Sequence, residues 1–352
     1  MPSENDTRPD VPAPRLFAYR DKIPAWRYWA IFAGFVLLSV IAAVLLLPVS
    51  ETQVDLAVDA THMRFDISEA RNIVDELQLS HVEIWGLTRI AFPRRIVDES
   101  AANLAGMVST SDSISLSTIT DDDGEAGRLQ IREIPINPNT RVVVRRGQMG
   151  DSYGLAVAGN RQPLKMQVVV SGPVEVTVPG KIEAQTIDFG PVARAFALTG
   201  LPDGVNWEFD LAPGTVGRMA DLLTVHDVRF EYVIDYNNLK RATSSIRAGS
   251  VSFRDVNHRA YEIRPGELLR LGGADGILRT VSLDPADAGL TVEFQGRVTD
   301  VSAAASPDHH PRTQMPSWVE LFWAHYRPVV LFCALLMIFA QIAWMIYLLT
   351  SR

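Results

Sequence analysis

Short segments in which apolar and polar residues alternate dominate the middle of the chain, between residues 51 and 307. Among them are "QVDLAV", "HMRFDI", "RVVVRR", "LKMQVVV", "PVEVTV" and "LTVEFQGRV", and clusters of Gly, Pro, Asn and Asp separate them. A period of two residues predicts strands with one buried face, and the turn residues predict hairpin connections. The density of these segments predicts a mainly β domain of antiparallel, sandwich-like sheets.

Helical periodicity is rare in this region. The segment "SEARNIVDELQ" places Ala70, Ile73, Val74 and Leu77 on one stripe, behind Ser68. A serine suits the N-cap position, so we expect one short helix here.

Two long apolar runs flank the β-rich region, at residues 29–49 and 329–349. Each holds 21 residues without a charge. At helical rise each covers roughly 31 Å, close to the hydrocarbon thickness of a bilayer, so the runs predict two transmembrane helices. Aromatic residues beside the runs predict anchors at the membrane interface. These anchors are Trp26, Tyr28, Trp29, Trp318, Trp323 and Tyr326.

The charges beside the first run predict its orientation. Basic residues precede it and acidic residues follow it, so the positive-inside tendency places the N-terminus in the cytoplasm. A second span returns the C-terminus there and leaves a large extracytoplasmic domain. The chain has one cysteine, Cys333, and its only glycosylation sequon begins at Asn5. Eukaryotic outer domains of this size usually carry disulfides and sequons, so we expect a bacterial inner membrane and a periplasmic domain.

These patterns divide the chain into seven parts. The expected parts are a flexible cytoplasmic tail (1–28), a first span (29–49), two extracytoplasmic β regions (50–172 and 173–302), a linker with an interfacial aromatic segment (303–328), a second span (329–349) and a cytoplasmic C-terminus (350–352).

Polar and small residues inside the runs predict contacts between helices. Gln341 lies two residues from the midpoint of the second run, and Ser39 is the midpoint of the first. Antiparallel spans would bring this amide and hydroxyl to nearly the same depth, where they could form a hydrogen bond. Small residues at a spacing of four, or sharing a face with Gln341, favour close helix approach. The predicted contact residues are Gln341, Ser39, Ala30, Gly34, Ala43 and Ala334.

Charge and cysteine content exclude several functions. The formal net charge of −8 argues against a general affinity for nucleic acid, which requires a clustered basic surface. The single cysteine excludes an intramolecular disulfide and a cysteine-rich metal site.

One motif matches that of a serine nucleophile. The stretch "GDSYG", residues 150–154, satisfies Gly-x-Ser-x-Gly with Ser152 at its centre. A nucleophile elbow also requires a helix after the serine, whereas "LAVAGNRQP" follows, which is too short and too rich in Gly and Pro. We therefore expect a hairpin turn.

No metal or cofactor site is predicted. The acidic stretch "DDDGE", residues 121–125, does not place ligands at the EF-hand positions and is interpreted as a solvated turn. His309 and His310 are adjacent and would point to opposite sides of an extended segment, and the other histidines lack ligand spacing. The sequence therefore predicts no catalytic, cofactor-binding or metal-binding residue.

The function predicted from these patterns is a non-enzymatic, membrane-anchored accessory or scaffold subunit of a larger envelope or transport complex. Its expected partners are the lipid bilayer, other integral membrane proteins or further copies of the chain, with carbohydrate stacking on Trp85, Trp207 or Tyr153 as a further possibility. An alternative is a channel subunit, because the two-span topology resembles that of acid-sensing and ATP-gated channels. This resemblance covers no motif, and the chain lacks their outer-domain disulfides. A weaker alternative is an envelope hydrolase that uses Ser152.

Overall fold

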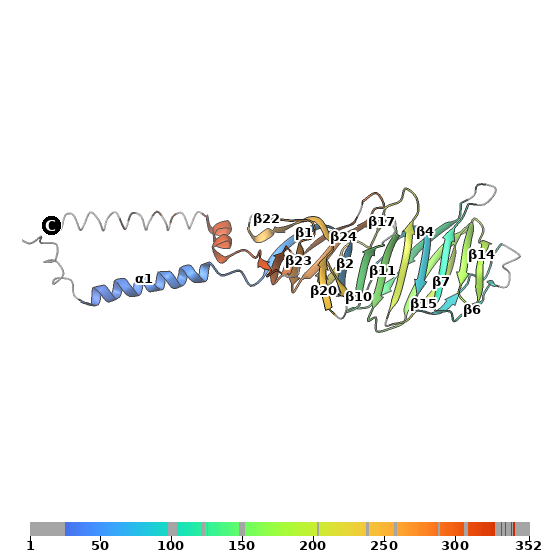
Figure 1. Ribbon diagram of the computed structural model, residues 1–352, viewed down its shortest axis with the longest axis horizontal. Coiled ribbons are helices and arrows are strands. Elements are labelled where there is room, and N and C mark those ends of the chain that lie inside the picture. The colour runs from blue at the N-terminus through green and yellow to red at the C-terminus, as the bar shows by residue number, and fades with distance from the viewer. Residues whose placement is uncertain are drawn as a thin grey trace, which may run out of the picture.

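The computed structural model describes residues 25–97, 104–120, 124, 126–147, 152–202, 204–236, 239–256, 259–287, 289–305 and 309–327, together with 332, 335, 339 and 341. Its strands lie across the length of an elongated body, and the helix α1 (Ala25–Leu45) extends from one end of it (Figure 1). We call the strand-built part the β body. The predicted mainly β, antiparallel character is confirmed.

One sheet of 20 described strands runs through the β body, and all its pairings are antiparallel. Its strands are β1 (Thr52–Ala60), β2 (His62–Ile67), β4 (Leu77–Trp85), β5 (Leu87–Ala91), β6 (Val108–Ser109), β7 (Ser113–Thr118), β8 (Arg128–Glu133), β10 (Arg141–Arg146), β11 (Ser152–Ala158), β12 (Leu164–Ser171), β13 (Pro173–Val178), β14 (Ile182–Asp188), β15 (Arg194–Gly200), β16 (Val205–Leu211), β17 (Gly217–Arg218), β18 (Leu223–Arg229), β21 (Ile246–Phe253), β22 (Arg259–Ile263), β24 (Asp275–Leu283) and β25 (Leu290–Val298).

Three smaller sheets, a 3-10 helix and a helix at residues 318–327 lie outside the large sheet. The sheets pair β3 (Arg71–Asn72) with β9 (Pro135–Ile136), β19 (Glu231–Tyr236) with β20 (Leu239–Ser244), and β26 (Asp300–Ala304) with both β23 (Leu268–Gly272) and β27 (Arg312–Thr313). A 3-10 helix covers Arg254–Val256.

The large sheet divides at β4. From the end nearest α1, neighbouring strands are β22, β21, β1, β25, β24, β18, β2, β10, β11, β16 and β4. The far edge of β4 is then shared, because residues 77–79 pair with β8 and residues 81–85 pair with β7. One branch continues through β13 to β14, and the other through β12, β15 and β5 to β6.

Ser80 lies at the point where β4 changes partners. It is bulged out of register with β16, since His81 pairs with Asp210 while Leu79 pairs with Leu211. The Ser80 hydroxyl donates to the carbonyl of Leu211 (3.2 Å), and the Thr118 hydroxyl donates to the carbonyl of Ser80 (3.2 Å). These side chains therefore satisfy backbone groups that the divided ladder leaves without strand partners.

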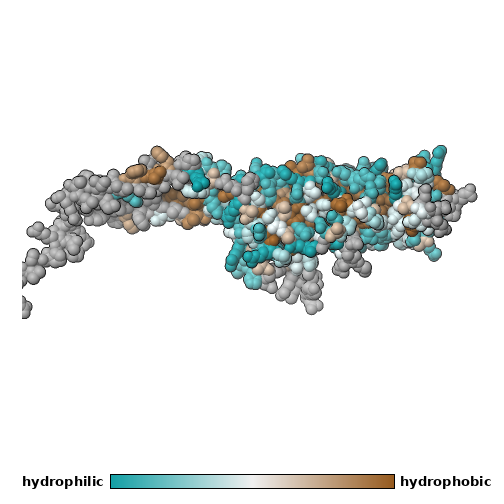
Figure 2. All heavy atoms as spheres, turned by 90° about the horizontal axis from the view of Figure 1, so that it is seen from above, coloured by the Kyte–Doolittle hydropathy of each residue, from teal (hydrophilic) through white to brown (hydrophobic). Residues whose placement is uncertain are grey.

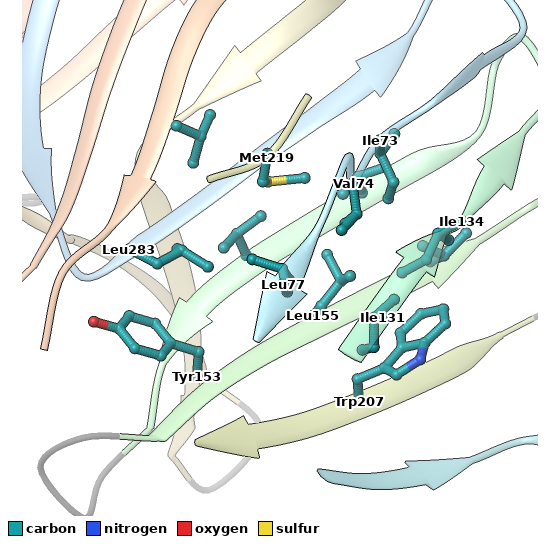
Figure 3. Close-up of a cluster of buried hydrophobic side chains, with 14 of the residues drawn as sticks. Ile73, Val74, Leu77, Ile131, Ile134, Tyr153, Leu155, Trp207, Met219 and Leu283 are labelled. Carbon is teal, nitrogen blue, oxygen red and sulfur yellow. The ribbon is translucent and has the colours of Figure 1, made fainter. Parts of the chain in front are cut away.

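A continuous apolar core fills the β body, and it follows the period of two. In β1, alternate residues from Val54 to Ala60 are buried. Figure 3 shows the core around Leu77 and Leu155, where the indole of Trp207 also packs. Where the two branches face each other, Phe189 and Phe196 meet with ring centroids 5.5 Å apart.

The predicted helix at residues 68–77 is wrong. The segment instead contains β3, a β-bridge between Val74 and Met219, and the start of β4. Ile73 and Val74 are fully buried in the core (Figure 3). Ser68 does not cap a helix, since its hydroxyl bonds Nδ1 of His226 (3.1 Å). The apolar spacing correctly indicated that Ile73, Val74 and Leu77 are buried. Their backbone is extended rather than helical, because contacts with distant strands bury them.

The predicted two-span topology is also wrong. Of the residues the structure describes, no helix combines the length and apolar character needed to cross a membrane. The last four residues of the predicted first span, 46–49, are not helical, because Pro48 forms a β-bridge with Ser317 and Val49 enters the β body. Most of 329–349 lies outside the described residues. The transmembrane helices, the inner-membrane location and the cytoplasmic placement of both termini are therefore corrected.

The predicted division of the β region at residue 172 stays a prediction. Strands from both sides of it pair directly, for example β13 with β7 and β16 with both β11 and β4. The predicted tail and C-terminus lie outside the described residues, apart from residues 25–28.

The division of β4 generates a testable expectation for Thr118. Thr118→Val keeps the shape of the side chain but removes the donor to the Ser80 carbonyl, so we expect a loss of about 1 kcal/mol in the free energy of unfolding. Urea unfolding measures the change. Thr186→Val, on the exposed face of β14, is the matched control and should change stability by less than about 0.5 kcal/mol. Equal effects of the two substitutions would show that this hydrogen bond does not stabilise the fold.

Candidate functional site: a docking surface at the helical end

The two ends of the described chain are joined where the β body meets the helices. Pro48 and Ser317 form an antiparallel bridge. The Val49 N–H donates to the carbonyl of Pro316 (2.9 Å), and the Trp318 N–H donates to that of Leu47 (3.1 Å). These bonds hold the end of α1 beside the start of a second helix at residues 318–327. We call α1 and this helix together the helical end.

A capping box starts the second helix. The Ser317 N–H donates to Glu320 Oε2 (2.8 Å), and the Glu320 N–H donates to Ser317 Oγ (3.3 Å). This reciprocal pair satisfies backbone donors that the first turn leaves free. The other carboxylate oxygen of Glu320 accepts from Arg259 Nη1 of β22 (2.6 Å), which ties the helix to the β body. The sequence indicates a short helix in the segment "PSWVELFWAHYRP", and sequence reasoning missed only its cap, although the Ser-x-x-Glu pattern at 317–320 signals it.

The second helix carries a row of exposed aromatic side chains. Trp318, Phe322 and Tyr326 are four residues apart and share one face. Their exposed fractions are 36%, 45% and 54%, and the neighbouring Trp323 is 44% exposed. The rings of Phe322 and Tyr326 contact each other with centroids 5.6 Å apart, so the row is continuous.

Apolar side chains of α1 extend the exposed surface. At about 100° per residue, the exposed residues from Phe32 to Val44 cover about half of the helix circumference. Phe32 and Leu37 are 60% and 61% exposed. Figure 2 shows apolar side chains gathered at this end. The exposed residues are Phe32, Val36, Leu37, Val40, Ile41 and Val44.

The helix contacts predicted from the sequence stay predictions. Ser39, Ala43 and Gln341 are exposed and Gly34 is half-exposed. Trp318, Trp323 and Tyr326 lie on the second helix, and their predicted role as interfacial anchors stays a prediction. The remaining predicted residues have side chains outside the described part of the structure: Ala30, Ala334, Trp26, Tyr28 and Trp29.

Ser152 does not lie on a nucleophile elbow. It begins β11, whose partner β10 precedes it, and its carbonyl accepts from the Gly147 N–H (2.7 Å). The residues after it continue as a strand. A hydrolase elbow requires a helix at this point, so the geometry does not suit nucleophilic catalysis. The structure agrees with the expected hairpin.

The structure gives no support to a metal site or to carbohydrate stacking at the residues it describes. His81 bonds the hydroxyl of Ser117 (2.8 Å) across β4 and β7. Within the described residues, no group of three or more His, Cys, Asp or Glu side chains could hold a metal ion. Most of the acidic turn at 121–125 lies outside them. Tyr153 and Trp207 are buried, with exposed fractions of 0% and 1%, so these two rings cannot stack on a carbohydrate.

The chain matches no family model, no curated protein and no solved structure. Any conclusion about its function therefore rests on its own surface. The helical end is the part of that surface best suited to binding, because it exposes large apolar side chains on both helices.

Removal of the capping box should loosen the second helix selectively. Ser317→Ala removes the hydroxyl that accepts from the Glu320 N–H, so we expect a cost of about 1 kcal/mol to this helix. Hydrogen exchange read by mass spectrometry should show faster exchange at 318–327 and unchanged protection in β4 and β16. Ser317→Thr retains a capping hydroxyl and should restore most of the protection. Unchanged exchange in Ser317→Ala would contradict the assigned role of the cap.

His62 predicts a pH dependence of stability. Burial, together with the charges of Arg145 and Arg64, lowers the pKa of His62 from 6.5 to about 4. Between these values the unfolded chain takes up a proton that folded His62 does not bind, so stability falls as the pH drops from 6.5 towards 4. The expected loss at pH 4.5 is about 2 kcal/mol, after allowance for the partial exposure of the ring.

The measurement for this prediction is urea unfolding at pH 7.5 and pH 4.5. In His62→Gln the titrating group is absent, so the loss of stability between the two pH values should be smaller than in the original chain. The same loss in both proteins would show that His62 does not cause it.

Proposed function

We propose that this protein is a non-enzymatic accessory or scaffold subunit of a larger complex, and that it docks on a partner protein through the helical end. The β body then serves as a rigid extension that holds its outer surface at a distance from the docking point. The exposed apolar surface of α1 and of the helix at 318–327 is the observation that carries the proposal.

The apolar character of this surface supports docking. Folded monomers rarely expose contiguous apolar patches larger than a few hundred Å², and larger ones commonly mark binding sites. The helical end exposes large apolar side chains on both helices, including three aromatic residues on one face of the second. The ion pair between Glu320 and Arg259 joins the second helix to β22, which supports a preferred orientation between that helix and the β body.

The nature of the surface favours a protein partner with an apolar face of its own. Aromatic residues are enriched in the cores of protein interfaces, where they bury much area at a small entropic cost. The charged side chains beside the row already have partners. Glu320 forms an ion pair with Arg259, and the guanidinium of Arg327 lies over the Trp323 ring, 5.7 Å from its centroid. The channel alternative required two spans, and the hydrolase alternative required an elbow at Ser152, so neither is proposed.

The test uses affinity-tagged full-length chain and a charged helical-end variant. In Val36→Glu/Val40→Glu, two exposed apolar side chains of α1 become charged, and burying them against a partner is costly. We expect the original chain to co-purify with a partner at fixed stoichiometry, and the variant to lose that partner by at least about tenfold.

A matched control places charge on the far end of the β body. Thr186→Glu lies on the exposed face of β14 and should leave the partner bound. Circular dichroism and thermal unfolding would establish that both variants retain the β body. Equal recovery of the partner by the helical-end variant would contradict the proposal. Recovery of this chain alone, as a monomer or as a homo-oligomer by light scattering, would contradict it as well.

A further inference from the structure

A second feature lies in the β body, away from the helical end. It is a depression of about 380 Å³ bordered by β3, β9 and the start of β12. The strand β9 forms its middle, because Ile136 pairs with Arg71 of β3 on one side and β12 lies on the other. The ladder between β12 and β8 begins only at Gln167, two residues after Lys165. Arg71 and Lys165 therefore reach the depression from strands on opposite sides of β9.

A buried amide organises the floor. Asn160 is 4% exposed, and its Oδ1 accepts from the N–H and the Nδ2 of Asn137 (3.2 and 2.8 Å) and from the hydroxyl of Thr140 (3.3 Å). Its Nδ2 donates to the carbonyl of Gln162 (2.9 Å). These bonds fix both loops that enclose the depression, so its polar groups are positioned before any ligand arrives.

The charge of the lining is one-sided. Arg71 and Lys165 are its charged residues, and no carboxylate lines it. Nη1 of Arg71 donates to the neutral carbonyl of Leu222 (2.9 Å), which leaves the guanidinium charge uncompensated. The nearest carboxylates along the chain, Glu69 and Glu133, are exposed and are not among the lining residues. The two cations of the lining contrast with the net charge of −8 of the whole chain.

We propose that this depression binds a small polyhydroxylated anion, such as an acidic sugar, with Arg71 and Lys165 holding its charged group. Carboxylate and phosphate groups both suit a guanidinium and an ammonium. The amides of Asn137 and Gln162 supply hydrogen-bond partners for hydroxyl groups. A volume of about 380 Å³ lies at the lower end of the range for small-molecule sites. This site is independent of the proposed docking surface.

Calorimetric titration of the full chain at low salt tests the site. The probes are glucuronate, glucose 6-phosphate and neutral glucose, so that the two charged arms distinguish a carboxylate ligand from a phosphate ligand. We expect saturable binding of at least one charged probe, at least about tenfold tighter than binding of glucose, and weaker at high salt because charge pairing supplies the discrimination.

Variants connect any binding to the proposed residues. Arg71→Gln, Lys165→Gln and the double variant should each lower the affinity for the charged probe by about tenfold or more. Lys181→Gln, an exposed residue in the turn between β13 and β14, is the matched control and should bind as the original chain does. Thermal unfolding would check that each variant is folded. Failure of both charged probes to bind at about 10 mM, equal binding of glucose, or undiminished binding by the double variant would overturn the proposal.

Discussion

The division of one edge of β4 between two partners is the constraint on which the rest of the β body depends. A strand edge can form only one ladder along any stretch, so β7 and β8 must take successive parts of β4. The sheet therefore continues as two branches with facing apolar surfaces, and the contact between Phe189 and Phe196 closes the core between them. Ser80 and Thr118 make the division possible by bonding the backbone groups that it would otherwise leave buried and unpaired.

The two proposed sites use different physical forces, which matches their positions. At the helical end, burial of apolar area would drive association, and hydrogen bonds at 47–49 and 316–318 set the geometry. In the depression beside β9, charge and hydrogen bonding would select a ligand, and the buried amide of Asn160 sets the geometry. The depression lies in the β body itself, away from the helical end, so binding at one proposed site would not obstruct the other.

Much of the β architecture could be predicted from single segments. Alternation in segments such as "QVDLAV" and "RVVVRR" predicts strands correctly, because a half-buried strand needs only a period of two. The stripe from Ile73 to Leu77 misled, since spacing of three and four residues is compatible with an irregular extended path when several surfaces bury it. The apolar run at 29–49 predicted a helix that continues to residue 49, whereas α1 ends at Leu45, because Pro48 forms a bridge with Ser317, which is distant in sequence.

The sequence by itself determined the strand-rich character and the absence of an intramolecular disulfide, since these depend on composition or on residues close together in the chain. Only the tertiary structure decided which strands pair, where β4 divides, and that Arg71 and Lys165 border the same depression. Those features join residues tens of positions apart, and local patterns carry no information about the register between distant strands. The candidate sites therefore became visible only when the long-range pairings placed their residues together.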